Sequence, residues 1–313
     1  MGRKIVLLAG PTASGKSRLA LELARMARAT IINADSVQLY QGMPLLSAQP
    51  SGEDREVAEH RLYGVLSPYE NGNVFQWLQL AEREIRRALG LGKLAVVVGG
   101  TGLYLARLLD GLRPDLPETD PALRDELNAL YGQIGWDRFA DIVRNVDPES
   151  VSKVVPGNRQ RLLRIYEVYR LSGRRMSELE KLPNRPVLER SEIFLVNILP
   201  PRDVVYERCA LRFRSIVDKA LAEVKHFLRV YPDSSSYSAA LGHTIGFREM
   251  ADYLQGKLSY GEMVELAIRN TRNFAKRQYT WFRNQFSSVD YTLEDVPGEK
   301  NVVALASEII SRL

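Results

Sequence analysis

An eight-residue loop near the start of the chain carries its most specific chemical pattern. The pattern G-x-x-x-x-G-K-[ST] is met by Gly10, Pro11, Thr12, Ala13, Ser14, Gly15, Lys16 and Ser17. The glycines of such a loop let backbone N–H groups point at phosphate oxygens, and the lysine adds a full positive charge. The final serine would ligate a Mg²⁺ ion that bridges phosphate oxygens. These residues predict a binding site for a di- or triphosphate with Mg²⁺.

A carboxylate and a hydroxyl that could act on such a ligand follow two short apolar runs. Asp35 comes after the run 30–33, and Thr101 comes after the run 94–98 with two glycines between. Because the carboxyl ends of parallel strands face the ligand crevice, we expect Asp35, Thr101 and the loop to converge on one cleft. Enzymes that transfer phosphoryl groups often hold their metal with a carboxylate after a second buried strand, and the run 94–98 ends without one. The loop alone leaves open whether the phosphate is transferred, hydrolysed or expelled as a leaving group.

Six short motifs are distributed along most of the chain. They occupy residues 35–40, 99–104, 117–124, 160–164, 245–249 and 271–283. Together with the phosphate loop they resemble the tRNA dimethylallyltransferase (tRNA isopentenyltransferase) family. The resemblance implies that a dimethylallyl group passes from dimethylallyl diphosphate to the exocyclic amine of the adenosine 3′ of the anticodon in tRNA, with release of diphosphate.

The resemblance also implies roles for four catalytic residues. Asp35 would accept a hydrogen bond from the adenine amine and later take its proton, which is general-base catalysis. Lys16, Thr101 and Arg212 would stabilise the negative charge that collects on the departing diphosphate. Arg212 falls where the family places its diphosphate-binding arginine, and the alternative interpretation is a charge on a surface helix. Ser17 would hold the metal.

The same resemblance implies contacts with tRNA in three segments. Arg161 and Arg164 are spaced to share one helix face, and Arg248 lies in a loop-like stretch beside a glycine. Basic helix faces are often simply solvated, and aromatic residues among them often face the core, so the residues alone leave RNA binding open. The implied contacts are Asp35, Ser36, Val37, Gln38, Thr101, Arg124, Gln160, Arg161, Leu162, Leu163, Arg164, His243, Thr244, Ile245, Gly246, Phe247 and Arg248.

The chain departs from the usual family pattern at several positions. Gln49, Arg61 and Arg159 stand where the family usually has lysine, histidine and aspartate. The helix after Arg212 reads as one residue short and lacks the usual glycine. The resemblance implies that the three substitutions lie in stretches that face the substrate, so we expect them to bear on substrate preference more than on the reaction.

The elements that must position these residues are predicted from periodicity. Apolar runs at 4–9, 30–33, 94–98 and 193–198 alternate with helical patterns such as 17–28 and 74–90. This favours an α/β fold, a P-loop NTPase-like parallel sheet with covering helices. Residues 113–190 have helical periodicity between proline-rich borders and are expected to form an inserted all-helical, tRNA-binding subdomain. Residues 1–112 and 191–313 would form the catalytic core, with long helices over 202–286 and a final short helix within 287–313.

Composition restricts the remaining classes of protein. The chain has 313 residues, a net charge of +5 and a single cysteine, Cys209, which excludes an internal disulfide and a multi-cysteine zinc site. Its three histidines are scattered, and no metal role is expected for them. No apolar run approaches the length of a membrane span, and the first strand leaves no room for a signal peptide, so we expect a cytoplasmic protein. We also expect it to be a monomer.

Three other functions remain to be weighed. An adenylate prenyltransferase of the cytokinin type would share the phosphate loop and Asp35, but such enzymes typically lack the inserted subdomain. A small-molecule kinase would use the same loop for ATP, and the missing carboxylate after residue 98 counts against it. An RNA-binding module gated by a nucleotide would not need Asp35 and Thr101 beside a complete loop.

Overall fold

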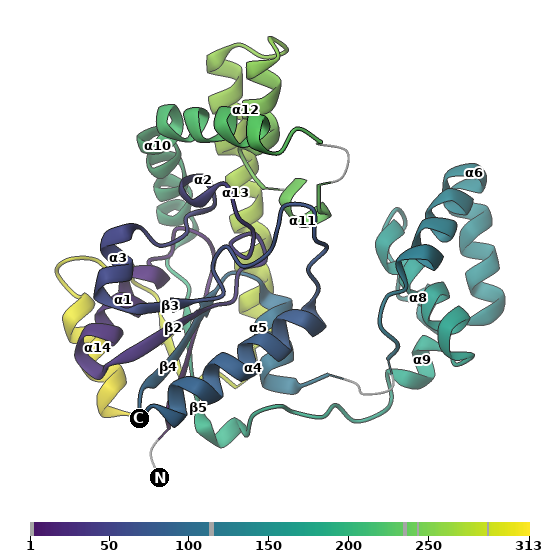
Figure 1. The fold of residues 1–313 in the computed structure, drawn as a ribbon. Helices are drawn as coiled ribbons and strands as arrows, with labels where there is room; N and C mark the ends of the chain where they lie inside the picture. The colour runs from purple at the N-terminus through teal and green to yellow at the C-terminus, as the bar shows by residue number, and fades with distance from the viewer. Residues whose placement is uncertain (1–2, 113–115, 234–236, 243, 287) are drawn as a thin grey trace. The chain divides into compact units, whose positions relative to one another are not determined.

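The computed structural model describes residues 3–112, 116–233, 237–242, 244–286 and 288–313 (Figure 1). The chain forms two compact units. The core unit comprises Met1–Leu109 and Val187–Leu313, and the inserted unit comprises Asp110–Pro186. Among the described residues, no helix is both long enough and apolar enough to span a membrane.

A six-stranded parallel sheet forms the centre of the core unit, in the order β3-β2-β4-β1-β5-β6. Its strands are β1 (Ile5–Ala9), β2 (Ala29–Asn33), β3 (Glu59–Arg61), β4 (Leu94–Gly99), β5 (Ile193–Ile198) and β6 (Tyr291–Leu293). The four central strands are the four predicted apolar runs, and every residue in them is buried. The edge strands were not predicted, since each has only three residues and neither reads as an apolar run.

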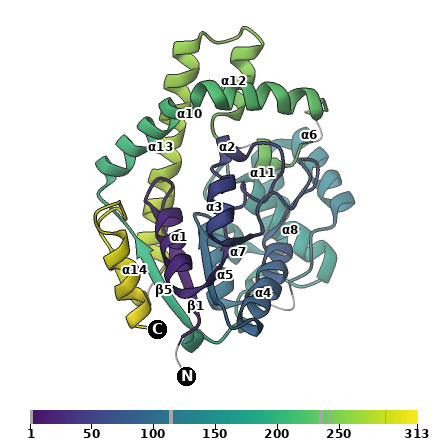
Figure 2. The ribbon, with the colours of Figure 1, turned by 60° about the vertical axis from the view of Figure 1, so that its left-hand side comes forward.

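Helices cover both faces of this sheet (Figure 2). On one face, α1 (Lys16–Ala27) and α14 (Val302–Ser311) form a continuous apolar core with alternate residues of the strands, such as Val6 and Leu8. The helix α4 (Val74–Gly90) packs against β2 and β4. Its Trp77 stacks on Tyr104 of α5 (Gly102–Asp110), with ring centroids 4.5 Å apart. The fold is the predicted α/β sheet with covering helices.

Residues 202–285 of the core unit form mainly helices, as expected, and the helices are interrupted by short connections. Two long helices, α10 (Arg202–Val230) and α13 (Tyr260–Gln285), pack against each other. The short α11 (Ala239–Gly242) and α12 (Phe247–Leu254) lie between them in the sequence. Two more short helices, α2 (Pro44–Ser47) and α3 (Gly52–Val57), follow β2, and the 3₁₀ helix η1 (Arg190–Glu192) precedes β5.

The inserted unit has its own apolar core. Its helices are α6 (Pro121–Val146), α7 (Pro148–Ser152), α8 (Arg159–Ser172) and α9 (Met176–Leu179). Gly135, with φ 74° and ψ −177°, divides α6 into two helical segments. Where the chain enters and leaves this unit, Leu112 and Arg185 form an antiparallel bridge, and the Arg185 N–H donates to the Leu112 carbonyl at 2.9 Å.

Candidate active site

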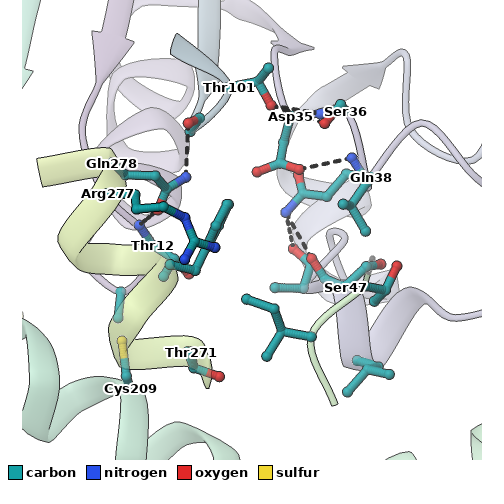
Figure 3. Close-up of a pocket in the computed structure, with 18 of the residues that line it drawn as sticks. Thr12, Asp35, Ser36, Gln38, Ser47, Thr101, Cys209, Thr271, Arg277 and Gln278 are labelled. Atoms are coloured by element: carbon teal, nitrogen blue, oxygen red, sulfur yellow. Dashed lines mark hydrogen bonds between the residues drawn. The ribbon is translucent and has the colours of Figure 1, made fainter. Parts of the chain in front are cut away.

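A cavity of about 560 Å³ lies in the core unit (Figure 3). Its lining is mostly apolar and includes Leu46, Phe213, Ile245, Phe274 and Trp281. Polar groups also reach it, namely Thr12, Asp35, Ser36, Gln38, Thr101, Arg212 and Gln278. The structure thus brings together Asp35, Thr101 and part of the phosphate loop, as the strand-end argument predicted. Mostly apolar walls with a few convergent polar groups are typical of a small-molecule site.

The phosphate loop has the backbone that its glycines permit. Gly10 has φ 149°, and a Cβ added there would lie 2.4 Å from the Ile198 carbonyl oxygen. Gly15 caps α1 with φ 96°, so the first N–H groups of that helix point out of its N-terminus. The ammonium Nζ of Lys16 donates to the carbonyl of Gly10 at 2.8 Å and also to that of Pro11. The positive end of the helix and a buried cation therefore meet in one loop.

Not every residue of the predicted diphosphate-binding loop can donate to a phosphate. Pro11 has no N–H, and its carbonyl accepts from Lys16. The N–H of Thr12 already donates to Gln278 Oε1 at 2.8 Å, and that of Ser14 donates to the Pro11 carbonyl at 3.3 Å. In this conformation these three residues have no backbone N–H free for a phosphate. The other N–H groups of the loop are those of Gly10, Ala13, Gly15, Lys16 and Ser17, and their contact with a phosphate stays a prediction.

Burial shifts the three charges around the cavity toward neutrality. Burial lowers the pKa of Lys16 to about 8, although the nearby carboxylate of Asp35 acts in the opposite direction. Burial also lowers the pKa of Arg212, against the pull of Cys209 and Asp35. The guanidinium of Arg212 lines the cavity, and its Nη2 contacts only the Leu46 carbonyl at 3.4 Å among the described hydrogen bonds. Two poorly compensated cations beside one carboxylate favour an anionic ligand.

Asp35 is held by the end of β2. Its N–H donates to Asn33 Oδ1 at 2.8 Å, and its Oδ1 accepts from the Val37 N–H at 3.0 Å. Burial raises the pKa of Asp35, while the Val37 hydrogen bond and Lys16 act against that rise. A partly buried carboxylate with a raised pKa is a stronger proton acceptor than a solvated one, which suits a general base.

Thr101 and Gln38 hold the segment around Asp35. Thr101 Oγ1 accepts from the Ser36 N–H at 2.9 Å and donates to Ser36 Oγ at 3.3 Å. Gln38 Nε2 donates to the carbonyls of Ser47 and Ala48, each at 3.0 Å. These side chains order the wall of the cavity through the contacts that Figure 3 draws. A direct contact of Thr101 with diphosphate stays a prediction.

Gln278 is a site residue to which the sequence analysis gave no role. Its side chain lines the cavity and is bound both to Thr12 and to the carbonyl of Gly100. Helical spacing places Gln278 on the buried face of α13 with Ala275 and Phe282. Helical periodicity predicts an apolar residue at position 278, so the polar glutamine there was a signal in the sequence that could have identified it.

Comparison with known proteins decides the family. The family model described as IPP transferase matches residues 38–285. The tRNA dimethylallyltransferase of Phenylobacterium zucineum (strain HLK1) is 38% identical over 288 residues, 92% of this chain and 92% of that protein. That of Paramagnetospirillum magneticum (strain ATCC 700264 / AMB-1) is 40% identical over 283 residues, 90% of this chain and 88% of that protein. The chain belongs to the IPP transferase family.

Solved structures of similar proteins have the same fold. The full-length tRNA isopentenylpyrophosphate transferase of Bacillus halodurans is 28% identical, with a TM-score of 0.67, and covers 99% of this chain and 96% of its own. A eukaryotic dimethylallyltransferase that acts on tRNA superposes with a TM-score of 0.82 at 22% identity, over 98% of this chain and 78% of its own, which shows the shared fold. The expected fold class and the expected enzyme class, a tRNA dimethylallyltransferase, are confirmed.

Two predicted tRNA contacts of this IPP transferase are core residues. Leu162 and Leu163 are 0% and 2% exposed within the apolar core of the inserted unit, so their side chains cannot reach RNA. The motif 160–164 lies on one helix, and its apolar positions face inward. Gln160 and Arg161 of the same motif are exposed.

Arg124 and Arg164 are engaged within the inserted unit. Both guanidinium groups contact one oxygen of the fully buried Glu167, at 2.6 Å and 2.9 Å respectively. Arg164 also donates to the carbonyl of Pro117, which fixes the segment that leads into α6. These pairs give both arginines a structural role, because a buried carboxylate needs its paired cations. A contact of either arginine with tRNA stays a prediction.

The segment around Gly246 divides between the cavity and the core. Thr244 and Ile245 line the cavity, whereas Phe247 is buried and packs edge-to-face on Phe227. Arg248 lies in the first turn of α12, so the expected loop is wrong, although its side chain is 86% exposed. Burial removes the side chain of Phe247 from contact with tRNA, and a contact through its backbone stays a prediction. His243 lies outside the described residues.

The departures from the family pattern have local structural explanations. Gln49 Nε2 donates to the Tyr40 carbonyl at 2.8 Å, so a neutral amide fastens the segment where a lysine is usual. Arg61, on the edge strand β3, forms an ion pair with Glu59. Arg159 donates to Asn128 Oδ1 at 2.6 Å, and its guanidinium lies 4.9 Å from the centre of the Tyr131 ring. None of these three residues lines the cavity.

Proposed function

We propose that this chain transfers the dimethylallyl group of dimethylallyl diphosphate to the exocyclic amine of the adenosine 3′ of the anticodon in tRNA. The supporting observation is one cavity that combines a poorly compensated Arg212, an apolar wall and the carboxylate of Asp35. A diphosphate, a five-carbon chain and an adenine amine each require one of these three surroundings. Family membership supports the same reaction.

The diphosphate leaves with the electron pair of the allylic C–O bond. Negative charge therefore grows on its oxygens in the transition state, where fixed cations stabilise it more than they stabilise the bound donor. Arg212 and the N–H groups at the start of α1 face this charge, and Lys16 joins them when Nζ exchanges the loop carbonyls for phosphate oxygens. Leu46, Phe213 and Ile216 in the same cavity would exclude water from the allylic carbon.

The adenine amine forms the new C–N bond and loses one proton. Its lone pair is delocalised into the ring, so a carboxylate that accepts an N–H hydrogen bond increases its nucleophilicity. Asp35 would fill this role and take the proton as the bond forms. Ser36 and Gln38 are proposed to contact the base, with Val37 beside them.

A Mg²⁺ ion fits the start of α1. No group of three or more His, Cys, Asp or Glu side chains that could hold a metal occurs among the described residues. Mg²⁺ does not need one, since it commonly keeps several waters and takes its other ligands from substrate phosphates. The exposed Ser17 would supply the protein oxygen, and the ion would neutralise charge on the diphosphate. Calorimetric titration of diphosphate, with and without Mg²⁺, on the Ser17→Ala variant tests this assignment.

The inserted unit is proposed to bind tRNA through its exposed basic side chains. Gln160 and Arg161 remain available on α8, as does Arg248 on α12 of the core unit. An anticodon loop offers unpaired bases, and an unpaired adenosine can be turned out at modest cost. We propose that the protein acts as a cytoplasmic monomer.

Prenyl transfer from labelled dimethylallyl diphosphate tests the proposal directly. Unmodified tRNA and AMP are offered side by side with Mg²⁺, and label is expected in tRNA at the adenosine 3′ of the anticodon. Label on AMP would instead make the chain an adenylate prenyltransferase, and the inserted unit would then need another explanation. The absence of transfer to either acceptor would refute the proposed reaction.

A further inference from the structure

Gln278 joins two parts of the active site that are far apart in the sequence. The residue lies on α13 and is 6% exposed. Its Oε1 accepts from the N–H of Thr12, and its Nε2 donates to the carbonyl of Gly100, both at 2.8 Å (Figure 3). The amide oxygen and the amide nitrogen of one buried side chain thus each form a hydrogen bond with the backbone of a different segment of the site.

The two segments carry opposite halves of the proposed reaction. Thr12 belongs to the loop that binds the diphosphate. Gly100 directly precedes Thr101, whose hydroxyl accepts from the Ser36 N–H next to Asp35. Gln278 therefore connects the leaving-group side of the cavity to the side that holds the general base.

The local geometry requires a glutamine opposite a glycine. One bond needs an acceptor and the other a donor, and a primary amide supplies both at its tip. A Cβ added to Gly100 would lie 2.3 Å from Nε2 of Gln278, so any larger residue would displace the amide. Arg208 supports the same loop from α10, with its Nε donating to the Ala13 carbonyl at 2.8 Å.

We propose that Gln278 is a positioning residue that fixes the separation between the diphosphate loop and the Asp35 segment. The inference rests on the proposed function, because it assigns Gln278 to the alignment of donor and acceptor. Lys16, Arg212 and the free loop amides bind the diphosphate without Gln278. Its loss should therefore misalign the allylic carbon and the amine, which lowers kcat, while the KM for the donor changes little.

The first test replaces the amide by an apolar side chain of similar length. For Gln278→Met we expect kcat to fall about 10–100-fold, with the donor KM within about threefold of the parent value. Amide hydrogen exchange at Thr12 should become faster in this variant, because its acceptor is gone. This second readout does not depend on catalysis. An unchanged kcat, or a raised KM with unchanged kcat, would overturn the proposal.

The second test uses pH to restore the missing donor. In Gln278→Glu, an ionised carboxylate would face the Gly100 carbonyl, whereas the protonated acid could again donate to it. Burial beside a carbonyl raises the pKa of such a glutamate, so the protonated form becomes more populated as the pH falls. We expect the activity of Gln278→Glu, relative to the parent at each pH, to rise at least several-fold from pH 8 to pH 6.

Gln285→Glu, at the exposed end of the same helix, is the matched control and should show a flat ratio. If the activity of Gln278→Glu relative to the parent also stays constant from pH 8 to pH 6, the proposal is overturned. A side chain that only fills space would not regain activity on protonation. The failure of the proposed function is distinguishable from these outcomes. In that case the parent protein would transfer no prenyl group to tRNA. Amide hydrogen exchange at Thr12 would still report on the hydrogen bond between Thr12 and Gln278.

Discussion

Burial shifts the pKa values of the charged residues around the cavity. Lys16 has a pKa of about 8 because it is removed from water, and the pKa of Asp35 is raised for the same reason. A bound diphosphate would compensate Lys16 and Arg212 and restore their ordinary preference for the charged form. The site is thus electrostatically incomplete by itself, as is common where binding and catalysis depend on charge.

The pH dependence of the reaction should reflect these two shifts. Lys16 is charged below about pH 8 and neutral above it, so kcat/KM for the donor should fall as pH rises through 8. The alkaline fall in kcat should occur at higher pH than the fall in kcat/KM, because bound diphosphate stabilises the ammonium of Lys16. On the acid side, activity should fall as Asp35 takes up a proton, at a pH above its ordinary 3.8. Steady-state kinetics between about pH 4 and about pH 10 measure the acid and the alkaline limb of the pH profile.

Lys16→Arg provides the control for the alkaline limb. Arginine keeps its charge throughout this range, so any activity that the variant retains should show no fall near pH 8. An alkaline limb that stays at the same pH in Lys16→Arg would show that another group titrates there.

Removal of the Asp35 carboxylate should affect turnover far more than RNA binding. For Asp35→Ala we expect kcat to fall by roughly 10²–10⁴-fold, the usual contribution of a positioned base. The dissociation constant for tRNA should stay within a few-fold, since the basic side chains proposed to hold tRNA are unchanged. Single-turnover kinetics and filter binding separate these two effects. Near-normal turnover in the variant would refute the assignment of Asp35.

At the scale of elements, helix α8 shows how one motif divides between two tasks. Arg161 and Arg164 are three residues apart and were expected to share one RNA-binding face. Arg164 instead reaches the fully buried Glu167, whereas the side chain of Arg161 is 48% exposed near Glu180. A small difference in direction on the helix thus decides whether an arginine pairs with a buried carboxylate or stays exposed.

Alanine substitutions on α8 should separate these tasks. Arg164→Ala should destabilise the protein by about 1–3 kcal/mol, because the Glu167 carboxylate loses one of its two cations. Arg161→Ala should change stability by less than about 0.5 kcal/mol but weaken tRNA binding. Thermal unfolding and tRNA titration of both variants check the expectation. Equal loss of stability in the two would contradict it.

The whole molecule consists of two units with separate apolar cores. The lining residues that the structure describes all belong to the core unit, so donor binding should not require the inserted unit. Recognition of tRNA, in contrast, is proposed to use basic side chains of both units. Removal of the inserted unit tests whether donor binding and tRNA binding depend on different units.

Deletion of residues 113–184 should leave a folded core unit. Leu112 and Arg185 already form a backbone bridge, so a short glycine–serine linker can join them. Diphosphate with Mg²⁺ should stabilise the shortened protein, by about 2.7 kcal/mol at a hundredfold excess over its Kd. Its affinity for tRNA should fall strongly, and calorimetry with tRNA titration measures both properties. A shortened protein that binds tRNA as tightly as the full chain would contradict the proposed role of the insertion.

Features that depend on local pattern could be predicted from the sequence. Four apolar runs specified the central strands, and the loop 10–17 specified a glycine-rich turn at a helix N-terminus. Asp35 and Thr101 could be placed in one cleft because parallel strands end at the same edge. These inferences need only neighbouring residues and one rule of topology.

The tertiary structure decided which side chains are free to act. Thr12 and Gln278 are 266 positions apart, and no local pattern shows that the amide of Gln278 occupies the Thr12 N–H. The same holds for Arg164, which helical spacing cannot distinguish from Arg161 until the partner Glu167 is placed. Burial and pairing arise from contacts between distant segments, and these are fixed only when the helices pack together.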